Sequence, residues 1–91
     1  MNRRRKGHSQ VSDDDLFYKV MGERIRQHRQ KLGLSQGELA GMVGVQEENV
    51  SRWERSVRRP TYENVRTLIG VFGLPLEALA PALHEWRYTE N

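Results

Sequence analysis

Residues 35–55 read SQGELAGMVGVQEENVSRWER, and the rest of the chain is arranged around the two helices that this segment predicts. The segment opens with an S-x-x-E capping box, in which the Ser35 hydroxyl and the Glu38 carboxylate each satisfy an orphan backbone N–H group at a helix start. A helix over residues 36–43 follows from that box. Gly44 can adopt positive φ and turn the chain sharply, and a second helical pattern follows almost at once over residues 46–55.

The tight turn decides how the two helices pack, because short helices joined by a single glycine turn cannot lie antiparallel. They are expected to meet at about 90 to 120°, which is the helix-turn-helix arrangement. This corner needs a small residue at the crossing, a glycine at the turn and apolar residues on the inner side. The segment supplies them in Leu39, Ala40, Val43, Gly44, Val45, Val50 and Trp53. The polar face of the second helix is left free. The alternative interpretation is that the segment is only a three-helix corner in an ordinary bundle and not a helix-turn-helix.

A longer helix is predicted before this segment, beginning near Leu16 after the carboxylates of residues 13–15, which favour the positive end of a helix dipole. Four residues at spacings of four, three and four predict its buried face: Met21, Ile25, His28 and Leu32. Gly33 is the expected stop.

Two further helices are predicted after the segment. Pro60 disfavours helical geometry at the residue before it, which indicates a loop over residues 56–60. Thr61 caps a helix that ends at Gly73, and Pro75 starts a short fifth helix reaching residue 80. The expected fold is therefore an all-α bundle of five helices over residues 16–80.

The two ends of the chain are expected to lie outside this bundle. Residues 1–15 predict a flexible basic arm, because they contain too few apolar side chains to bury a helix face. Residues 81–91 form a C-terminal tail that contains Trp86 and Tyr88, and such aromatic surface favours contact with its own domain or with the second subunit of a dimer.

Composition excludes several classes of protein. Only 36% of the 91 residues are hydrophobic, and no apolar stretch approaches the ~20 residues of a membrane span, so no membrane association is expected. The absence of cysteine excludes disulfides, thiolate nucleophiles and zinc ribbons. The three histidines lack metal-ligand spacing and no catalytic grouping is visible, so neither a metal, a cofactor nor an enzyme is predicted. With no secretory signal, a cytoplasmic location is expected.

A family resemblance rests on motifs that stay in register over about residues 20–79. These motifs are Gly22-Glu23-Arg24-Ile25-Arg26, Gly33-Leu34-Ser35-Gln36, Glu38-Leu39-Ala40, Val43-Gly44-Val45, Val50-Ser51-Arg52-Trp53-Glu54 and Pro60. They closely resemble the helix-turn-helix domain of the phage repressor and Cro family, also called the XRE family. The resemblance implies a lambda-repressor-like bundle in a DNA-binding transcriptional regulator. We expect a bacterial or phage repressor that places residues 46–55 in the major groove, as a homodimer on a palindromic operator.

The same resemblance implies roles for single residues. The residues at positions that reach bases are Gln46, Glu47, Glu48, Asn49 and Arg52, and those at positions near phosphates are Gln36, Ser51, Arg58 and Arg59. Arg52 is the foremost candidate, because a guanidinium can read guanine O6 and N7 together. Arg29 and Glu54 match a family pair that bridges the first helix to the end of the third. The arm residues Arg3, Arg4, Arg5 and Lys6 are candidates for phosphate or minor-groove contact, with a solubilising tail as the alternative.

Three positions depart from the family pattern. Glu47 and Glu48 place carboxylates at the tip of the reading helix, where they either point aside, accept from cytosine N4, or mark a helix that contacts protein. His28 stands where the family usually has a buried leucine, which predicts a partly buried core histidine. Ser56 replaces a more usual glycine after the third helix, which leaves the course of the loop open.

Two functional alternatives accompany the repressor. One is the antitoxin of a toxin–antitoxin pair, which binds its operator and a protein toxin. The other is a helix-turn-helix used for protein interaction only, an interpretation that the acidic pair favours. Steep salt dependence of DNA binding distinguishes the DNA-binding alternatives from the last.

Overall fold

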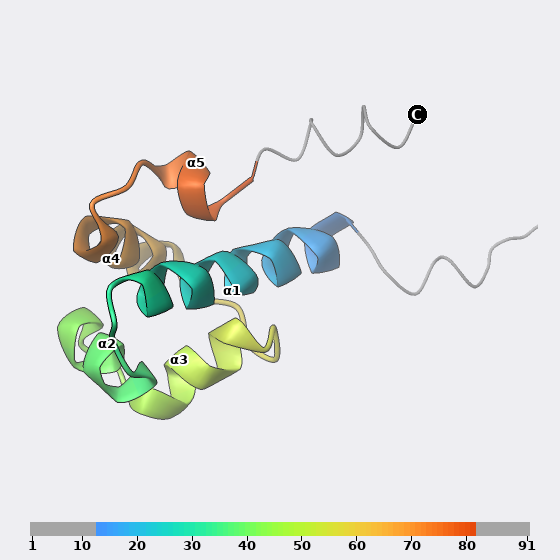
Figure 1. Ribbon diagram of the computed structural model, residues 1–91. Helices are drawn as coiled ribbons and strands as arrows, with labels where there is room; N and C mark the ends of the chain where they lie inside the picture. The colour runs from blue at the N-terminus through green and yellow to red at the C-terminus, as the bar shows by residue number, and fades with distance from the viewer. Residues whose placement is uncertain (1–12, 82–91) are drawn as a thin grey trace, which may run out of the picture.

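Five helices form the part of the chain that the computed structural model describes, residues 13–81. They are α1 (Asp13–Lys31), α2 (Gln36–Val43), α3 (Glu47–Glu54), α4 (Tyr62–Phe72) and α5 (Leu76–Leu79). Figure 1 shows α1 running through the middle of the bundle, with α4 and α5 on one side and α2 and α3 on the other. No strand occurs in residues 13–81, so the predicted all-α, five-helix bundle is confirmed.

Local hydrogen bonds define where the short helices begin and end. The Ser35 hydroxyl accepts from the Glu38 backbone N at 3.0 Å, and the Glu38 carboxylate accepts from the Ser35 backbone N at 2.8 Å. Gly44 ends α2 with φ 87°, a left-handed conformation in which its N–H donates to the Ala40 carbonyl. Thr61 caps α4 by accepting from the Asn64 backbone N at 3.1 Å. These caps lie where the sequence predicts them.

The ends of α1 differ from the prediction. The helix begins at Asp13, three residues early, so residues 13–15 are its first turn and do not belong to a flexible arm. The side chains of Asp14 and Asp15 lie in this first turn, where carboxylates suit the helix dipole. The rest of the arm, including Arg3, Arg4, Arg5 and Lys6, lies outside the described residues, as do residues 82–91 of the tail.

The prediction that Leu32 is buried was wrong. Helix α1 ends at Lys31, and Leu32 remains 51% exposed. Gly33 then adopts φ 71°, and this turn carries Leu34 toward the core, against which it packs partly buried. The helical spacing was extended one residue too far.

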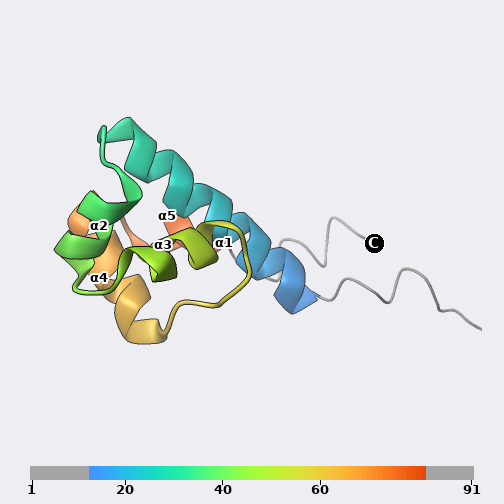
Figure 2. The same cartoon turned by 90° about the horizontal axis from the view of Figure 1, so that it is seen from below.

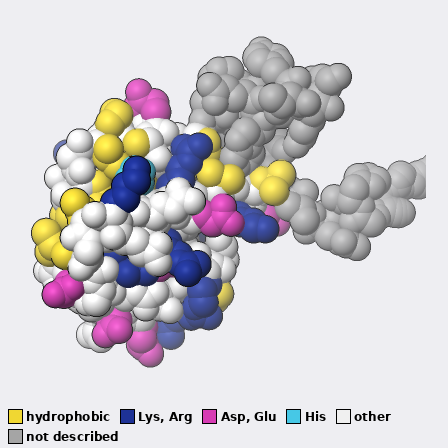
Figure 3. Space-filling view, in the orientation of Figure 1, with side chains coloured by type: hydrophobic (Ala, Val, Ile, Leu, Met, Phe, Trp, Pro, Cys, Tyr) yellow, Lys and Arg dark blue, Asp and Glu magenta, His cyan; other side chains and the backbone are white. Residues whose placement is uncertain are grey.

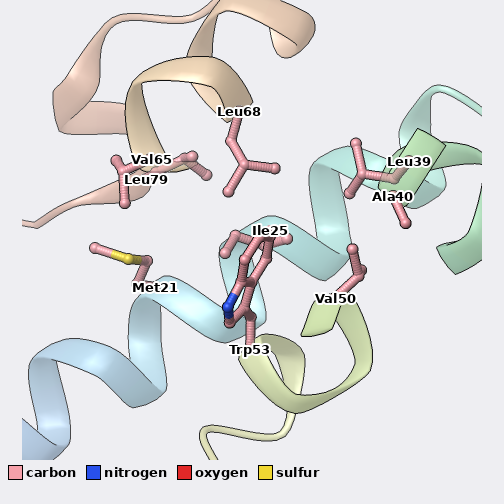
Figure 4. Packing of buried hydrophobic residues seen from close by; sticks show 9 residues of the cluster. All are labelled: Met21, Ile25, Leu39, Ala40, Val50, Trp53, Val65, Leu68 and Leu79. Atoms are coloured by element: carbon pink, nitrogen blue, oxygen red, sulfur yellow. The ribbon is translucent and has the colours of Figure 1, made fainter. Parts of the chain in front are cut away.

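A single apolar cluster joins all five helices. Its buried members are Met21, Ile25, Leu39, Ala40, Val50, Trp53, Val65, Leu68 and Leu79. Figure 4 shows the Trp53 ring pointing from α3 toward α1, where Ile25 is fully buried. Helix α3 buries Val50 and Trp53, and the side chain of Glu54 at its end is only 3% exposed. None of the helices in residues 13–81 is long and apolar enough to span a membrane.

Candidate nucleic-acid interface

An ion pair fixes the end of α3 to α1. Arg29 Nε donates to Glu54 Oε2 at 2.6 Å, and Arg29 Nη2 donates to Glu54 Oε1 at 3.0 Å. The Arg29 side chain is 12% exposed and that of Glu54 is 3% exposed. The hydrogen bonds to Glu54 raise the pKa of Arg29, against the opposing effect of burial. The expected bridge is therefore present, with the two-point geometry that a guanidinium and a carboxylate favour.

The same pair also gathers the start of α2. Arg29 Nη1 donates to the Leu34 carbonyl at 2.8 Å, and Gln36 Nε2 donates to Glu54 Oε1 at 3.0 Å. Gln36 is the residue at the start of α2 that is expected near a phosphate, and Glu54 orients its amide. An amide NH₂ group has two hydrogens, so this bond uses one of them. Three segments are thus locked together around one carboxylate.

The polar side of α3 carries the residues expected to reach bases. Gln46 is the N-cap of α3 and is exposed, Glu47 and Glu48 are exposed in the first turn, and Asn49 is half-buried. Arg52 lies one turn further along, with its side chain 41% exposed. Figure 2 looks onto α3 from below, with α2 at one end and the segment that follows α3 at the other.

The two carboxylates of this side have different surroundings. Glu48 Oε2 lies 4.0 Å from Arg52 Nη2, as an exposed pair spaced by four residues. Glu47 Oε1 lies over the first turn of α2, 3.1 Å from where a Cβ on Gly37 would stand. A carboxylate there faces the positive end of α2. Of the three interpretations, these positions favour the one in which the pair points aside, and that remains a prediction.

Three arginines follow Arg52 along the chain, at the end of α3 and in the loop to α4. Arg55 Nε donates to the Ser51 hydroxyl at 3.2 Å, so the serine expected near a phosphate lies beside an exposed cation. Arg58 is exposed. Arg59 Nη2 lies 3.5 Å from Asp15 Oδ1, and its guanidinium carbon lies 4.6 Å from the centre of the Tyr18 ring.

Ser56 resolves the course of this loop. It adopts φ 61°, the left-handed conformation that glycine would take more easily. Its hydroxyl donates to the Tyr18 carbonyl at 3.4 Å, and its backbone N–H donates to the Trp53 carbonyl at 3.1 Å. The loop therefore turns as a glycine would allow, with hydrogen bonds to α1 and α3.

Two residues that matter for this surface were not singled out from the sequence. A Cβ on Gly22 would overlap the backbone oxygen of Trp53 and lie 3.2 Å from that of Glu54, so α1 and α3 meet backbone to backbone here. A glycine within a helical pattern was the available signal. The second is Arg55, which belongs to none of the sequence motifs and extends the row of cations along the chain.

Charges of both signs lie together on this side. Figure 3 shows Lys and Arg side chains beside Asp and Glu side chains along the lower edge of the molecule, where α3 lies in Figure 1. Cations predominate toward the end of α3 and the following loop, in Arg52, Arg55, Arg58 and Arg59, and carboxylates toward its start.

His28 lies away from this surface, near α4. It is half-buried, with its ring centre 5.7 Å from that of Phe72, in agreement with the predicted core position. Burial, and then the nearby charges of Lys31 and Arg24, lower its pKa. Within residues 13–81, no three histidine, aspartate or glutamate side chains come together as a metal site, and His8 and His84 lie outside that range.

Known proteins share this arrangement. A family model described as helix-turn-helix matches residues 25–79. Repressor protein C2 of Salmonella phage P22 is 49% identical over 49 residues, which cover 54% of this chain and 23% of that protein. This chain spans less than a quarter of the length of the curated relatives it matches.

Two solved structures make the likeness three-dimensional. The P22 c2 repressor bound to a synthetic operator superimposes with a TM-score of 0.65 at 40% identity, over 68% of this chain and 94% of that one. The biofilm master regulator SinR, in complex with DNA, gives a TM-score of 0.61 at 30% identity, over 65% of this chain and 95% of that one.

Proposed function

Because the chain belongs to the phage repressor and Cro (XRE) family of helix-turn-helix proteins, we propose that it is a sequence-specific DNA-binding transcriptional repressor. It docks α3 in the major groove of a palindromic operator. Its family is one of DNA-binding regulators, so we infer regulation and not catalysis, and we propose a cytoplasmic protein of bacterial or phage origin. One observation carries the proposal: α3 turns a polar, arginine-bearing side outward while its inner side and its last residue are fixed to α1.

Within this proposal the residues divide into two roles. Arg52 reads a base, with Gln46, Glu47, Glu48 and Asn49 beside it. Gln36, Ser51 and the loop arginines Arg58 and Arg59 approach the sugar–phosphate backbone, where contacts set register without reading sequence. The orientation of Gln36 by Glu54 supports its role, because a preset amide loses less freedom on binding. The arm residues Arg3 to Lys6 add further cations.

Salt titration of duplex binding tests the proposal as a whole. A cation that neutralises a phosphate releases counterions, so affinity falls as salt rises. Each such contact contributes about −0.9 to the slope of the logarithm of the association constant against the logarithm of the salt concentration. A steep slope on both selected and random duplexes is the expected result. An affinity that is flat in salt, or absent, would favour a helix-turn-helix that contacts only protein.

Replacing Arg52 with alanine should weaken binding to the selected operator by about 1 to 3 kcal/mol and relax the preference at one base pair. Random duplex should be bound with nearly unchanged affinity, because most of its binding comes from phosphate contacts. Fluorescence anisotropy on both duplexes measures the difference.

Two matched variants separate base reading from charge. Arg52→Lys keeps the cation beside Glu48 and removes the planar fork, so it should lose discrimination like alanine. Arg26→Ala removes a charge that is exposed on α1 and should leave discrimination intact. Equal losses on selected and random duplex for Arg52→Ala would contradict the base-reading role.

Self-association completes the proposed mode of binding, since one helix-turn-helix reads only a few base pairs and two copies span half-sites about 34 to 36 Å apart. We propose that the tail after Pro81, with Leu83, Trp86 and Tyr88, covers a second subunit. Deletion of residues 83–91 should shift sedimentation equilibrium from dimer toward monomer and weaken operator binding. A deleted chain that dimerises as tightly as the full one would refute the tail's role.

A further inference from the structure

The loop between α3 and α4 has little apolar anchoring. Its one aliphatic side chain other than proline, Val57, is 65% exposed. The backbone N–H groups of Val57 and Arg58 both donate to the carbonyl of Arg52, at 2.9 and 3.3 Å. These bonds fix one side of the loop to the end of α3. The other side of the loop contacts a different helix.

That other element is the first half of α1. Arg59 is held in two ways there, by the ion pair with Asp15 at 3.5 Å and by stacking over the Tyr18 ring at 4.6 Å. The Ser56 hydroxyl donates to the carbonyl of Tyr18. Asp15 and Tyr18 are three residues apart and therefore share a face of the helix. Gly22, one turn further, brings the same part of α1 against the end of α3.

Asp15 and Tyr18 precede the part of the chain that the family model matches, which begins at Ile25. We call Asp15, Tyr18, Ser56 and Arg59 the loop clasp. It joins the loop to a part of α1 that precedes the matched residues. The adjacent Arg58 is exposed.

We propose that Asp15 and Tyr18 are positioning residues for DNA binding, which hold Arg59 so that the loop presents Arg58 to the sugar–phosphate backbone. This inference revises the role proposed above for Arg59, which then acts through the loop and leaves the phosphate contact to Arg58. This inference rests on the proposed function as a DNA-binding repressor.

Tyr18→Leu is the sharpest test, because it removes the ring under Arg59, keeps an apolar side chain and changes no charge. Affinity for selected and random duplex should fall about two- to fivefold, the worth of an exposed cation–π contact. The logarithmic salt slope should become shallower by about one phosphate contact. Tyr18→Phe keeps the ring and should match the wild type in both quantities. A packing role alone would leave the slope unchanged.

A double-mutant cycle with Arg58→Ala identifies the route of the effect. If Tyr18 acts by placing Arg58, the double variant should bind no more weakly than Arg58→Ala alone. Additive losses would overturn the proposal, as would an unchanged salt slope in Tyr18→Leu, since either result means that Arg58 is placed without the ring.

A readout without DNA tests the clasp separately. Trypsin cleaves after Arg55 and Arg58. Because Tyr18→Leu no longer holds the loop against α1, trypsin should cut the loop of this variant severalfold faster than the loop of the wild type or of Tyr18→Phe. An equal rate in all three proteins would overturn the clasp. If the wild type fails to bind duplex in a salt-dependent way, the proposed function and the DNA role fail together, while the cleavage rates still decide whether the clasp exists.

Discussion

Replacing Arg29 with alanine should lower the free energy of unfolding by about 3 to 5 kcal/mol, because it leaves a carboxylate buried without its cation. Glu54 is 3% exposed and would retain only the hydrogen bond from Gln36, while the Leu34 carbonyl would also lose its donor. Urea unfolding measures the loss directly.

Replacing both partners of the ion pair separates two effects: the loss of the attraction between Arg29 and Glu54, and the cost of a buried carboxylate without a cation. Arg29→Met combined with Glu54→Leu removes both charges and keeps most of the volume, so it should recover much of the stability that Arg29→Ala loses. Arg26→Ala, an exposed arginine on the same helix, should change stability little. An unfolding midpoint for Arg29→Ala equal to that of the wild type would contradict the structural role of the bridge.

Replacing Gly22 with alanine should destabilise the fold by about 1 to 3 kcal/mol, as overpacking of a tight contact does. The new Cβ meets backbone oxygens of α3, and a backbone cannot move aside as the end of a side chain can. Either α3 shifts away from α1, or the ion pair between Arg29 and Glu54 lengthens. Duplex affinity should therefore fall together with stability, because the proposed base-reading side belongs to α3.

Gly70 provides the matched control. It lies within α4, and a Cβ there would meet nothing within 4 Å. Gly70→Ala should stabilise the protein by up to about 1 kcal/mol, the usual gain from alanine over glycine in a helix. If Gly22→Ala were as stable as Gly70→Ala, the close approach of α1 and α3 would not limit the fold.

Local chemistry made much of this fold predictable. The capping box at Ser35, the glycine turn at Gly44 and the cap at Thr61 act within a few residues, so their structural outcome follows from sequence alone. The apolar inner side of the helix pair followed from spacing in the same way. Spacing alone did not place the end of α1, because both Leu32 and Leu34 fit a buried position and only the Gly33 turn selects between them.

The site was only partly predictable, because its contacts join residues far apart along the chain. Arg29 and Glu54 were paired through family resemblance, and no spacing rule would have paired residues 25 positions apart. The stacking of Arg59 on Tyr18 and the position of Glu47 over α2 depend on how helices meet in space. Sequence could name Glu47 as unusual without placing it.

The inner and outer sides of α3 also differ in what mutation can change. Val50, Trp53 and Glu54 are the residues of this helix that anchor it, while Glu47, Glu48 and Arg52 lie outside the apolar core. If the outer side reads bases as proposed, substitutions there can change which operator is preferred while the side chains that anchor the helix stay in place. On that proposal, new specificities would be accessible to this chain by single substitutions, each of which leaves the protein folded.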